Sequence, residues 1–265
     1  MPQKLKIVYY VEPDAAALAK RAAQYFVEQA ERAVAACGQA RIAISGGTTP
    51  KAAFALLADP AQPWRARMPW SRLDLWWVDE RCVPPGDPDS NYRMTREALL
   101  DHVPVKPEQI HRMQGELEPE LAAARYESEL RKSFRLEGAE TPSFDLIQLG
   151  LGTNGHTASL FPHTAALHEV SRLVVANLTD AAQPWRLTLT APVLNRGGCV
   201  FFLVCGGDKA QVIKEIFLGP ADTERLPAQL IRPANGRLVL LLDRAAAALL
   251  PAPDAQGYGT LERNQ

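Results

Sequence analysis

The sequence predicts an α/β protein whose largely parallel sheet is covered by helices on both faces. Short apolar runs alternate with longer helical patterns along most of the chain, which is typical of repeated β–α–β units. Loops rich in glycine, hydroxyl and charged side chains follow several of the apolar runs, as expected where parallel strands end. A chain of 265 residues can bury one large core, and we predict a single α/β domain over residues 1–265.

The N-terminal half alternates between strand and helix three times. The first apolar run ends at Glu12, Pro13 and Asp14, which break a strand. Asp, Ser and Asn side chains before the third helix are suited to accept hydrogen bonds from its first N–H groups. By residue number, the expected pairs of strand and helix are 5–11 with 15–37, 41–45 with 50–58, and 73–78 with 90–102.

The C-terminal half continues this alternation with less regular spacing. Residues 144–149 and 199–204 are short apolar runs, as strands buried on both faces require. The strands that we assign to the sheet in this half are residues 144–149, 173–177, 199–204 and 237–242, and the expected helices are residues 119–132 and 208–217. A small subdomain carried on an insertion is the alternative to a single domain with modest decorations.

The charge balance argues against a general attraction to polyanions. The chain carries 29 basic and 30 acidic residues, a net charge of −1, so its overall field favours neither nucleic acid nor an anionic membrane. No apolar run approaches the roughly 20 residues that span a bilayer, and the N-terminal run is too short for a signal core. We therefore expect a cytoplasmic protein with no nucleic-acid or membrane partner, in which any anion site is local.

The four cysteines do not indicate a metal site. Cys37, Cys82, Cys199 and Cys205 form no C-x-x-C pair and have no ligand-like spacing to histidine. Two of them lie in one apolar run, where a free cysteine packs as a small hydrophobe. We expect reduced thiols and no bound metal.

A Ser-Gly-Gly-Thr-Thr-Pro-Lys loop after the second predicted strand is a candidate phosphate site. Thr49 is suited to the N-cap of the following helix and Pro50 to its first position. Free N–H groups at a helix start, its positive dipole end and two hydroxyls can surround an anion, and glycine permits close approach. The alternative is a plain tight turn, since the loop matches neither a Walker A loop nor a Gly-x-Gly-x-x-Gly fingerprint. The candidate ligands are Gly46, Gly47, Thr48 and Thr49.

Charged side chains follow two further predicted strands. Arg81 is a candidate phosphate ligand because a guanidinium binds phosphate through two parallel hydrogen bonds, and Asp79 or Glu80 is expected to hold Arg81 or a neighbouring loop. The alternative is a surface ion pair at the end of the strand. Lys209, in a Gly-Gly-Asp-Lys loop at a helix start, is the second candidate phosphate ligand. Arg186 begins an alternating run and faces either a pocket or solvent.

One histidine lies where a ligand is expected to bind. The strand at residues 144–149 ends in Gly-Leu-Gly-Thr-Asn-Gly-His, which places His156 beyond the carboxyl end of a parallel strand. A titratable imidazole in that position is a candidate catalyst, and the alternative is an ordinary loop histidine. If the sheet is parallel, this loop converges with the three loops above. The remaining histidines are expected to be structural or solvated: His102, His111, His163 and His168.

Taken together, these motifs resemble the glucosamine-6-phosphate isomerase/6-phosphogluconolactonase family. The resemblance rests on four motifs that occur in order over most of the chain: Ser-Gly-Gly-Thr-Thr-Pro, Asp-Glu-Arg with Asp-Ser-Asn, Gly-Leu-Gly-Thr-Asn-Gly-His-Thr-Ala-Ser-Leu-Phe-Pro and Gly-Gly-Asp-Lys. It implies a Rossmann-like, three-layer α/β/α fold of the NagB/RpiA/CoA-transferase type. The motif that contains the histidine favours the lactonase branch.

The resemblance also implies a carboxylic ester hydrolase that converts 6-phospho-D-glucono-1,5-lactone to 6-phospho-D-gluconate in the oxidative pentose phosphate pathway. It implies no metal and no organic cofactor. His156 is implied as the general base that activates water and then returns the proton to the departing ring oxygen. Phosphate contacts are implied for residues 46–49, Arg81 and Lys209, and a substrate contact for Arg186. A transient contact with glucose-6-phosphate dehydrogenase is left open.

One position departs from the family pattern. Many relatives have Asp two residues before the histidine, whereas this chain has Asn154, which can hydrogen-bond the substrate or the loop but cannot orient or stabilise an imidazolium as a carboxylate does. A glucosamine-6-phosphate deaminase would need an acid there and another shortly after His156, and the next acid is Glu169. The other alternative is a non-catalytic phosphosugar-binding regulator, which would dispense with the base.

Overall fold

The structure, a computed structural model, describes residues 4–179 and 184–264. An eight-stranded sheet runs through its centre in the order β11-β1-β10-β9-β6-β2-β3-β5. All neighbours pair in parallel except β11, which is antiparallel to β1. This confirms the largely parallel sheet. The strands are β1 (Lys4–Glu12), β2 (Ala40–Ile44), β3 (Leu73–Trp77), β5 (Ile110–His111), β6 (Leu146–Leu149), β9 (Cys199–Val204), β10 (Arg237–Asp243) and β11 (Tyr258–Asn264).

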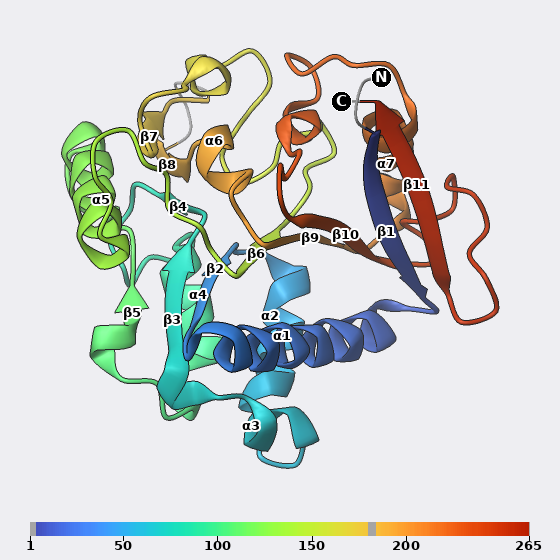
Figure 1. Cartoon of the computed structure of the whole chain (residues 1–265), viewed down its shortest axis with the longest axis horizontal. Helices are drawn as coiled ribbons and strands as arrows, with labels where there is room; N and C mark the ends of the chain where they lie inside the picture. The colour runs from blue at the N-terminus through green and yellow to red at the C-terminus, as the bar shows by residue number, and fades with distance from the viewer. Residues whose placement is uncertain (1–3, 180–183, 265) are drawn as a thin grey trace.

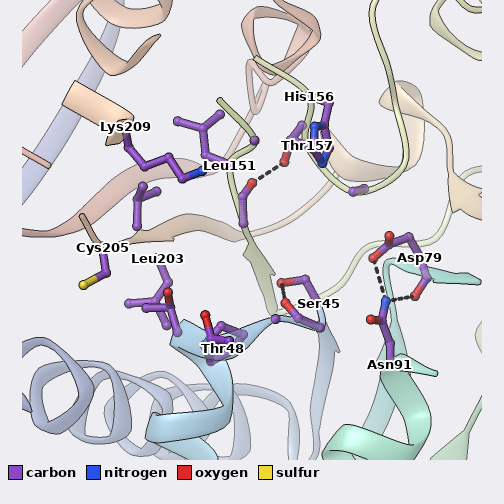
Figure 2. Close-up of a pocket in the computed structure, with 18 of the residues that line it drawn as sticks. Ser45, Thr48, Asp79, Asn91, Leu151, His156, Thr157, Leu203, Cys205 and Lys209 are labelled. Atoms are coloured by element: carbon purple, nitrogen blue, oxygen red, sulfur yellow. Dashed lines mark hydrogen bonds between the residues drawn. The ribbon is translucent and has the colours of Figure 1, made fainter. Parts of the chain in front are cut away.

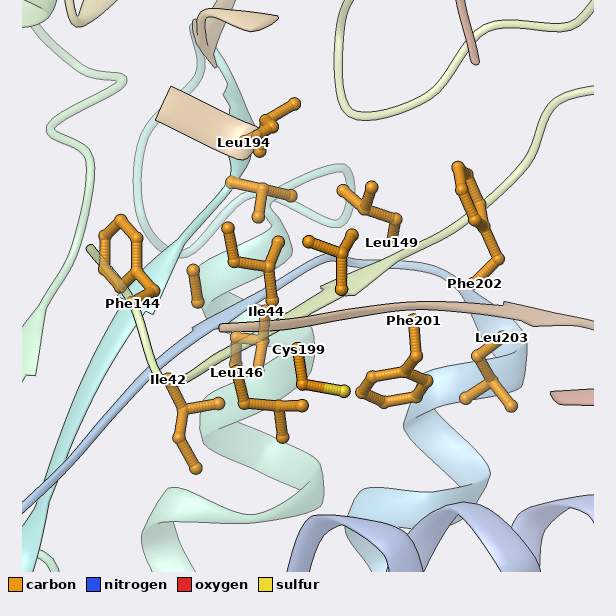
Figure 3. Close-up of a cluster of buried hydrophobic side chains, with 14 of the residues drawn as sticks. Ile42, Ile44, Phe144, Leu146, Leu149, Leu194, Cys199, Phe201, Phe202 and Leu203 are labelled. Atoms are coloured by element: carbon orange, nitrogen blue, oxygen red, sulfur yellow. The ribbon is translucent and has the colours of Figure 1, made fainter. Parts of the chain in front are cut away.

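Helices pack on both faces of this sheet (Figure 1). The α-helices are α1 (Ala15–Cys37), α2 (Thr48–Ala58), α3 (Pro63–Arg67), α4 (Asn91–Ala98), α5 (Pro119–Phe134), α6 (Ala191–Leu194) and α7 (Ala210–Leu218). Phe201 and Phe202 are neighbours on β9 and point to opposite faces (Figure 3). The ring of Phe201 lies 5.3 Å from that of Phe26 on α1, and the ring of Phe202 lies 5.8 Å from that of Phe217 on α7. The three-layer α/β/α arrangement follows from this two-sided burial.

Side chains cap the starts of α1 and α4, and the sequence predicts the cap of α4. The side chain of Asp14 accepts a hydrogen bond from the N–H of Ala17 at 2.9 Å, and Gly38 ends α1 with φ of 79°. The side chain of Ser90 likewise accepts a hydrogen bond from the N–H of Arg93 at 3.1 Å. Such caps satisfy N–H groups that have no partner inside the helix.

The start of α2 differs from the prediction. The helix begins at Thr48 and its N-cap is Gly47, so Thr49 as the N-cap and Pro50 as the first residue are wrong. Gly47 has φ of 111°, which glycine adopts without strain. This backbone conformation turns the chain into the helix two residues earlier than the side-chain pattern indicates.

A second sheet of three short antiparallel strands lies on the side of the large sheet opposite α1 and α2 (Figure 1). Its order is β4-β8-β7, with β4 at Asp79–Arg81, β8 at Arg186–Leu189 and β7 at Val174–Asn177. The strand predicted at residues 173–177 therefore exists, but its assignment to the parallel sheet is wrong. A parallel pair needs a crossover of about a dozen residues, and the segment between β7 and β8 is shorter, so these strands pair antiparallel.

His111 of β5 has a structural role at the edge of the large sheet. Its ring stacks on Trp76 with centroids 3.9 Å apart, Nδ1 lies 2.6 Å from Glu129 Oε1, and Nε2 lies 3.9 Å from Asp74 Oδ1. Burial alone would lower the pKa of His111, but the contacts with Asp74 and Glu129 outweigh burial and raise it to about 9. The ring is therefore an imidazolium at neutral pH in the folded protein.

We expect His111 to make stability depend on pH between about 6.5 and about 9. The folded state binds the proton more tightly than the unfolded chain, so the stabilisation is complete below the ordinary pKa and is lost as pH rises through about 9. In urea unfolding at about pH 6 and about pH 9.5, His111→Gln should remove about 1–2 kcal/mol of the difference between the two free energies of unfolding.

The matched control is His168→Gln. The His168 side chain is 70% exposed and lies 3.2 Å from Glu224, so screening by solvent leaves this contact little effect on stability. The free energy of unfolding of this variant should depend on pH as that of the wild type does. If His111→Gln also keeps the wild-type pH dependence, the contacts of His111 do not stabilise the fold.

Candidate active site

The loops that follow β2, β6 and β9 meet in one cavity of about 320 Å³. These strands are parallel neighbours, so their carboxyl ends lie at the same edge of the sheet. Figure 2 shows Lys209 and Leu151 on one side of the cavity, His156 and Thr157 on another, and Thr48 below them. The predicted site residues that line it are Gly46, Gly47, Thr48, Thr49, Asp79, Arg81, His156 and Lys209.

The start of α2 and the loop before it form one wall of the cavity. A Cβ atom at Gly46 would come within 1.8 Å of Asn91 Oδ1, and Gly47 has positive φ, so both positions favour glycine. The N–H groups in the first turn of a helix lack acceptors inside the helix, and the positive end of the helix dipole lies beside them. The wall therefore has the chemistry of an anion site.

The ring of His156 is oriented by two neighbours. Its Nδ1 lies 2.6 Å from Asn154 Oδ1, and a carbonyl oxygen only accepts hydrogen bonds, so Nδ1 carries the proton of the neutral ring and Nε2 keeps its lone pair. The ring also stacks on Phe161, with centroids 4.2 Å apart and planes 14° apart. A Cβ atom at Gly152 would lie 2.0 Å from Nδ1, so glycine makes room for this arrangement.

The environment of His156 disfavours its charged form. Burial is the largest cause, and the positive charges of Arg186, Lys209 and Arg81 add to it, so that the pKa is lowered to about 4. The imidazole is therefore neutral at neutral pH. A neutral ring with an unprotonated Nε2 can accept a proton from a water molecule in the cavity.

Three cations lie around the cavity. Arg81 and Arg186 are cross-strand partners on β4 and β8, and among the described residues neither Nε atom has a hydrogen-bond partner. Arg81 Nη1 donates to the carbonyl oxygen of Asp89, and Lys209 Nζ lies 3.1 Å from Asp208 Oδ2. Burial and the charge of Arg81 lower the pKa of Arg186. An anion bound beside these guanidinium groups would relieve their mutual repulsion.

Three predicted site residues lie outside the cavity lining. Asn154 lines an adjacent cavity together with Asp208 and meets the site through its bond to His156. Arg186 borders the site, where its charge acts on His156. Glu80 is buried behind it and supports the neighbouring loop, as described next.

The two acids of β4 have different partners. Glu80 accepts hydrogen bonds from the N–H groups of Arg81, Asn91 and Tyr92 at 2.7–2.8 Å and from Ser90 Oγ at 3.0 Å, which fixes the start of α4. Asp79 accepts from Ser159 Oγ at 2.8 Å and from Asn91 Nδ2 at 3.3 Å. Burial raises the pKa of both carboxyl groups, against the opposing effect of these and other partners.

Sequence reasoning did not single out several residues that shape the site. Gln148 is fully buried on β6, accepts from the N–H of Ser45 at 2.9 Å and donates to Ser45 Oγ at 2.8 Å, which ties the ends of two strands together. Its signal in the sequence is a glutamine inside an apolar strand, because a buried amide needs hydrogen-bond partners. Asn91 and Ser159 lie in motifs that carry the family resemblance, but nothing in the sequence indicates which residues they contact in the site.

The described residues contain neither a metal-binding cluster nor a membrane-spanning helix. Across residues 4–179 and 184–264, no group of three or more His, Cys, Asp or Glu side chains is arranged to hold a metal ion. Over the same residues, no helix combines the length and the apolar character that crossing a membrane requires. The four cysteines are free thiols.

The sequence is similar to a known family and to curated relatives. A family model described as glucosamine-6-phosphate isomerases/6-phosphogluconolactonase matches residues 13–240. The 6-phosphogluconolactonase of Synechocystis sp. is 44% identical over 86% of this chain and 92% of its own length. The 6-phosphogluconolactonase of Haemophilus influenzae is 40% identical over 79% of this chain and 87% of its own length.

Solved structures agree with these relatives. A crystal structure of devB protein is similar with a TM-score of 0.83 and 35% identity, over 92% of this chain and all of that one. The 6-phosphogluconolactonase from Trypanosoma cruzi has a TM-score of 0.79 and 29% identity, over 94% of this chain and 98% of its own. A monomeric glucosamine-6-phosphate deaminase, at 20% identity and a TM-score of 0.74, shares the fold. The chain belongs to the glucosamine-6-phosphate isomerase/6-phosphogluconolactonase family.

Proposed function

We infer that this protein is a 6-phosphogluconolactonase, which hydrolyses 6-phospho-D-glucono-1,5-lactone to 6-phospho-D-gluconate in the oxidative pentose phosphate pathway. The observation that carries the inference is a neutral histidine whose Nε2 keeps its lone pair, beside a cavity bordered by three cations and a helix start. Relatives of this name at 37–44% identity support it.

In the proposed mechanism, His156 Nε2 takes a proton from a water molecule as the water oxygen attacks the lactone carbonyl carbon. The hydrogen bond from Nδ1 to Asn154 Oδ1 keeps Nε2 as the accepting atom. The tetrahedral intermediate then collapses, the bond between the carbonyl carbon and the ring oxygen breaks, and the proton passes from Nε2 to that oxygen. Water is consumed and the histidine returns to its starting form.

The phosphate group would bind between the start of α2 and the cations of Arg81 and Lys209, with Arg186 next to them. Anchoring a remote phosphate positions the lactone carbonyl at the base. A bound phosphate would also offset the positive charges that lower the pKa of His156. The base would thus become stronger when substrate is present.

The two alternative functions are less compatible with the site. A deaminase of this fold would need acids where the chain has Asn154 and the segment that follows His156, and the deaminase similarity extends only to the fold. A regulator without catalysis would not need an imidazole with a fixed tautomer. We propose a cytoplasmic location and a phosphosugar lactone as the small-molecule partner, and this reaction requires no docking to glucose-6-phosphate dehydrogenase.

The first prediction concerns the base. His156→Ala should lower kcat for freshly generated 6-phosphogluconolactone by about 100-fold or more, with little loss of affinity for 6-phosphogluconate. Activity is measured by coupling to 6-phosphogluconate dehydrogenase with the spontaneous rate subtracted, and affinity by calorimetry. Comparable turnover by the folded variant would remove His156 from this role, and no acceleration by the wild type would refute the lactonase.

The second prediction separates phosphate binding from chemistry. Arg81→Ala and Lys209→Ala should raise KM for the phosphorylated lactone by about 10-fold or more and leave the KM for unphosphorylated glucono-1,5-lactone nearly unchanged. Arg67→Ala is the control, because Arg67 is an exposed arginine on α3 paired with Glu31. Equal effects on both lactones would contradict the phosphate assignment.

The third prediction concerns Asn154. In the free enzyme kcat/KM should fall only as pH drops through about 4, because His156 must be unprotonated. Asn154→Asp places a carboxylate beside Nδ1, which stabilises the imidazolium and should move this acid limb to higher pH. The control is Asn235→Asp, the same change at an exposed position. An acid limb that does not move would mean that position 154 does not act on the ring.

A further inference from the structure

The small sheet presents one polar face to the catalytic loop. Side chains alternate along a strand, so Asp79 and Arg81 of β4 share a face, as do Arg186 and Thr188 of β8. Asn177 of β7 is the cross-strand partner of Arg186, and Thr188 is the partner of Asp79. The two arginines lie beside the cavity. The side chains of Asp79, Thr188 and Asn177 instead hydrogen-bond one residue of the loop after His156.

That residue is Ser159, three residues after the histidine. Its Oγ donates to Asp79 Oδ2 at 2.8 Å, its N–H donates to Thr188 Oγ1 at 3.2 Å, and its carbonyl oxygen accepts from Asn177 Nδ2 at 2.9 Å. Each strand of the small sheet thus supplies one side chain to one serine. Ser159 is 1% exposed and its three partners are 0–6% exposed, so water cannot readily replace these bonds.

The turn between His156 and Ser159 is strained. Ala158 has φ of 47°, a left-handed conformation that is costly for a residue with a Cβ atom. Such a conformation persists where surrounding contacts determine it. The same turn is held by hydrogen bonds from the N–H of Gly152 to the carbonyl oxygen of His156 and from Thr157 Oγ1 to the carbonyl oxygen of Gly150.

We propose that Ser159 is a positioning residue for His156, held by Asp79, Thr188 and Asn177 so that the strained turn keeps the imidazole against Asn154 and Phe161. This proposal rests on the proposed function for its kinetic consequence, but its structural consequence is independent of substrate. All three bonds are needed to hold the turn, so the loss of one lets the turn at Ala158 relax and the ring of His156 leave its place in the cavity. A displacement of about 1 Å is enough to lower a catalytic rate by up to about 100-fold.

The test begins with Ser159→Ala, which removes the Oγ bond to Asp79 and leaves the two backbone bonds of residue 159 in place. We expect kcat to fall about 10-fold while KM for the phosphorylated lactone stays within about 2-fold, because the phosphate ligands are untouched. In an NMR titration of the ring nitrogens without substrate, the pKa of His156 should rise toward its ordinary value of about 6.5 as the ring loses its buried position. A folded variant with wild-type kcat and wild-type His156 titration would overturn the proposal.

A second pair of variants changes the partner of Ser159 on β8. Thr188→Val keeps the shape of the side chain but removes the acceptor for the N–H of Ser159, whereas Thr188→Ser keeps that acceptor. We expect Thr188→Val to repeat the loss of kcat and Thr188→Ser to retain more of the wild-type value. Equal losses in the two variants would count against the hydrogen bond. This pair also serves if Ser159→Ala does not fold.

The matched control is Thr190→Ala, which removes another fully buried hydroxyl just beyond β8. Thr190 Oγ1 donates to the carbonyl oxygen of Arg172 at 2.9 Å and does not contact the catalytic loop through any described bond. Its kcat, KM and His156 titration should match the wild type. A loss of kcat equal to that of Ser159→Ala would reduce the effect to general destabilisation and overturn the proposal. Failure of the wild type to accelerate lactone hydrolysis would instead refute the proposed function. The titration of His156 would still test whether Ser159 positions the ring.

Discussion

Parallel pairing of β2, β6 and β9 places three loops, far apart in sequence, at one edge of the sheet. The pairing is fixed where the strands end, because Gln148 of β6 bonds both the N–H and the hydroxyl of Ser45. Such a buried amide costs free energy unless both of its polar atoms are satisfied. A shift of β6 against β2 would break both bonds, so the register that brings the helix start to the histidine loop is strongly specified.

Local charge matters more at this site than the charge of the chain. The net charge is −1, yet Arg81, Arg186 and Lys209 surround one cavity and add to the effect of burial, which is the largest cause of the lowered pKa of His156. The cations that are proposed to bind phosphate thus also help to keep His156 unprotonated. A substrate anion would reverse part of this effect, which links recognition of the phosphate to the strength of the base.

The sequence predicts six of the eight strands of the large sheet, because these are short apolar runs that need burial on both faces, and β9 and α1 have the predicted bounds. It does not predict β5, which has two residues, or β11, which is mostly polar. It predicts the cavity because parallel strands end together. It does not predict the small sheet, because the strands are short and their polar side chains are typical of loops. Three of those side chains are buried and hydrogen-bond Ser159, which the sequence does not reveal. The backbone-determined start of α2 and the orientation of His156 by Asn154 also depend on three-dimensional contacts.

The small sheet explains why the turn after His156 can tolerate strain. A left-handed Ala158 would relax in an isolated loop, but here the neighbouring Ser159 bonds three strands at once. The same strands carry the two arginines beside the cavity. If the proposed roles hold, one element therefore holds both Arg81, one of the proposed phosphate ligands, and the turn that bears the base. Their separation is then set by strand geometry and not by loop flexibility, which is the condition for binding energy at the phosphate to orient the distant carbonyl.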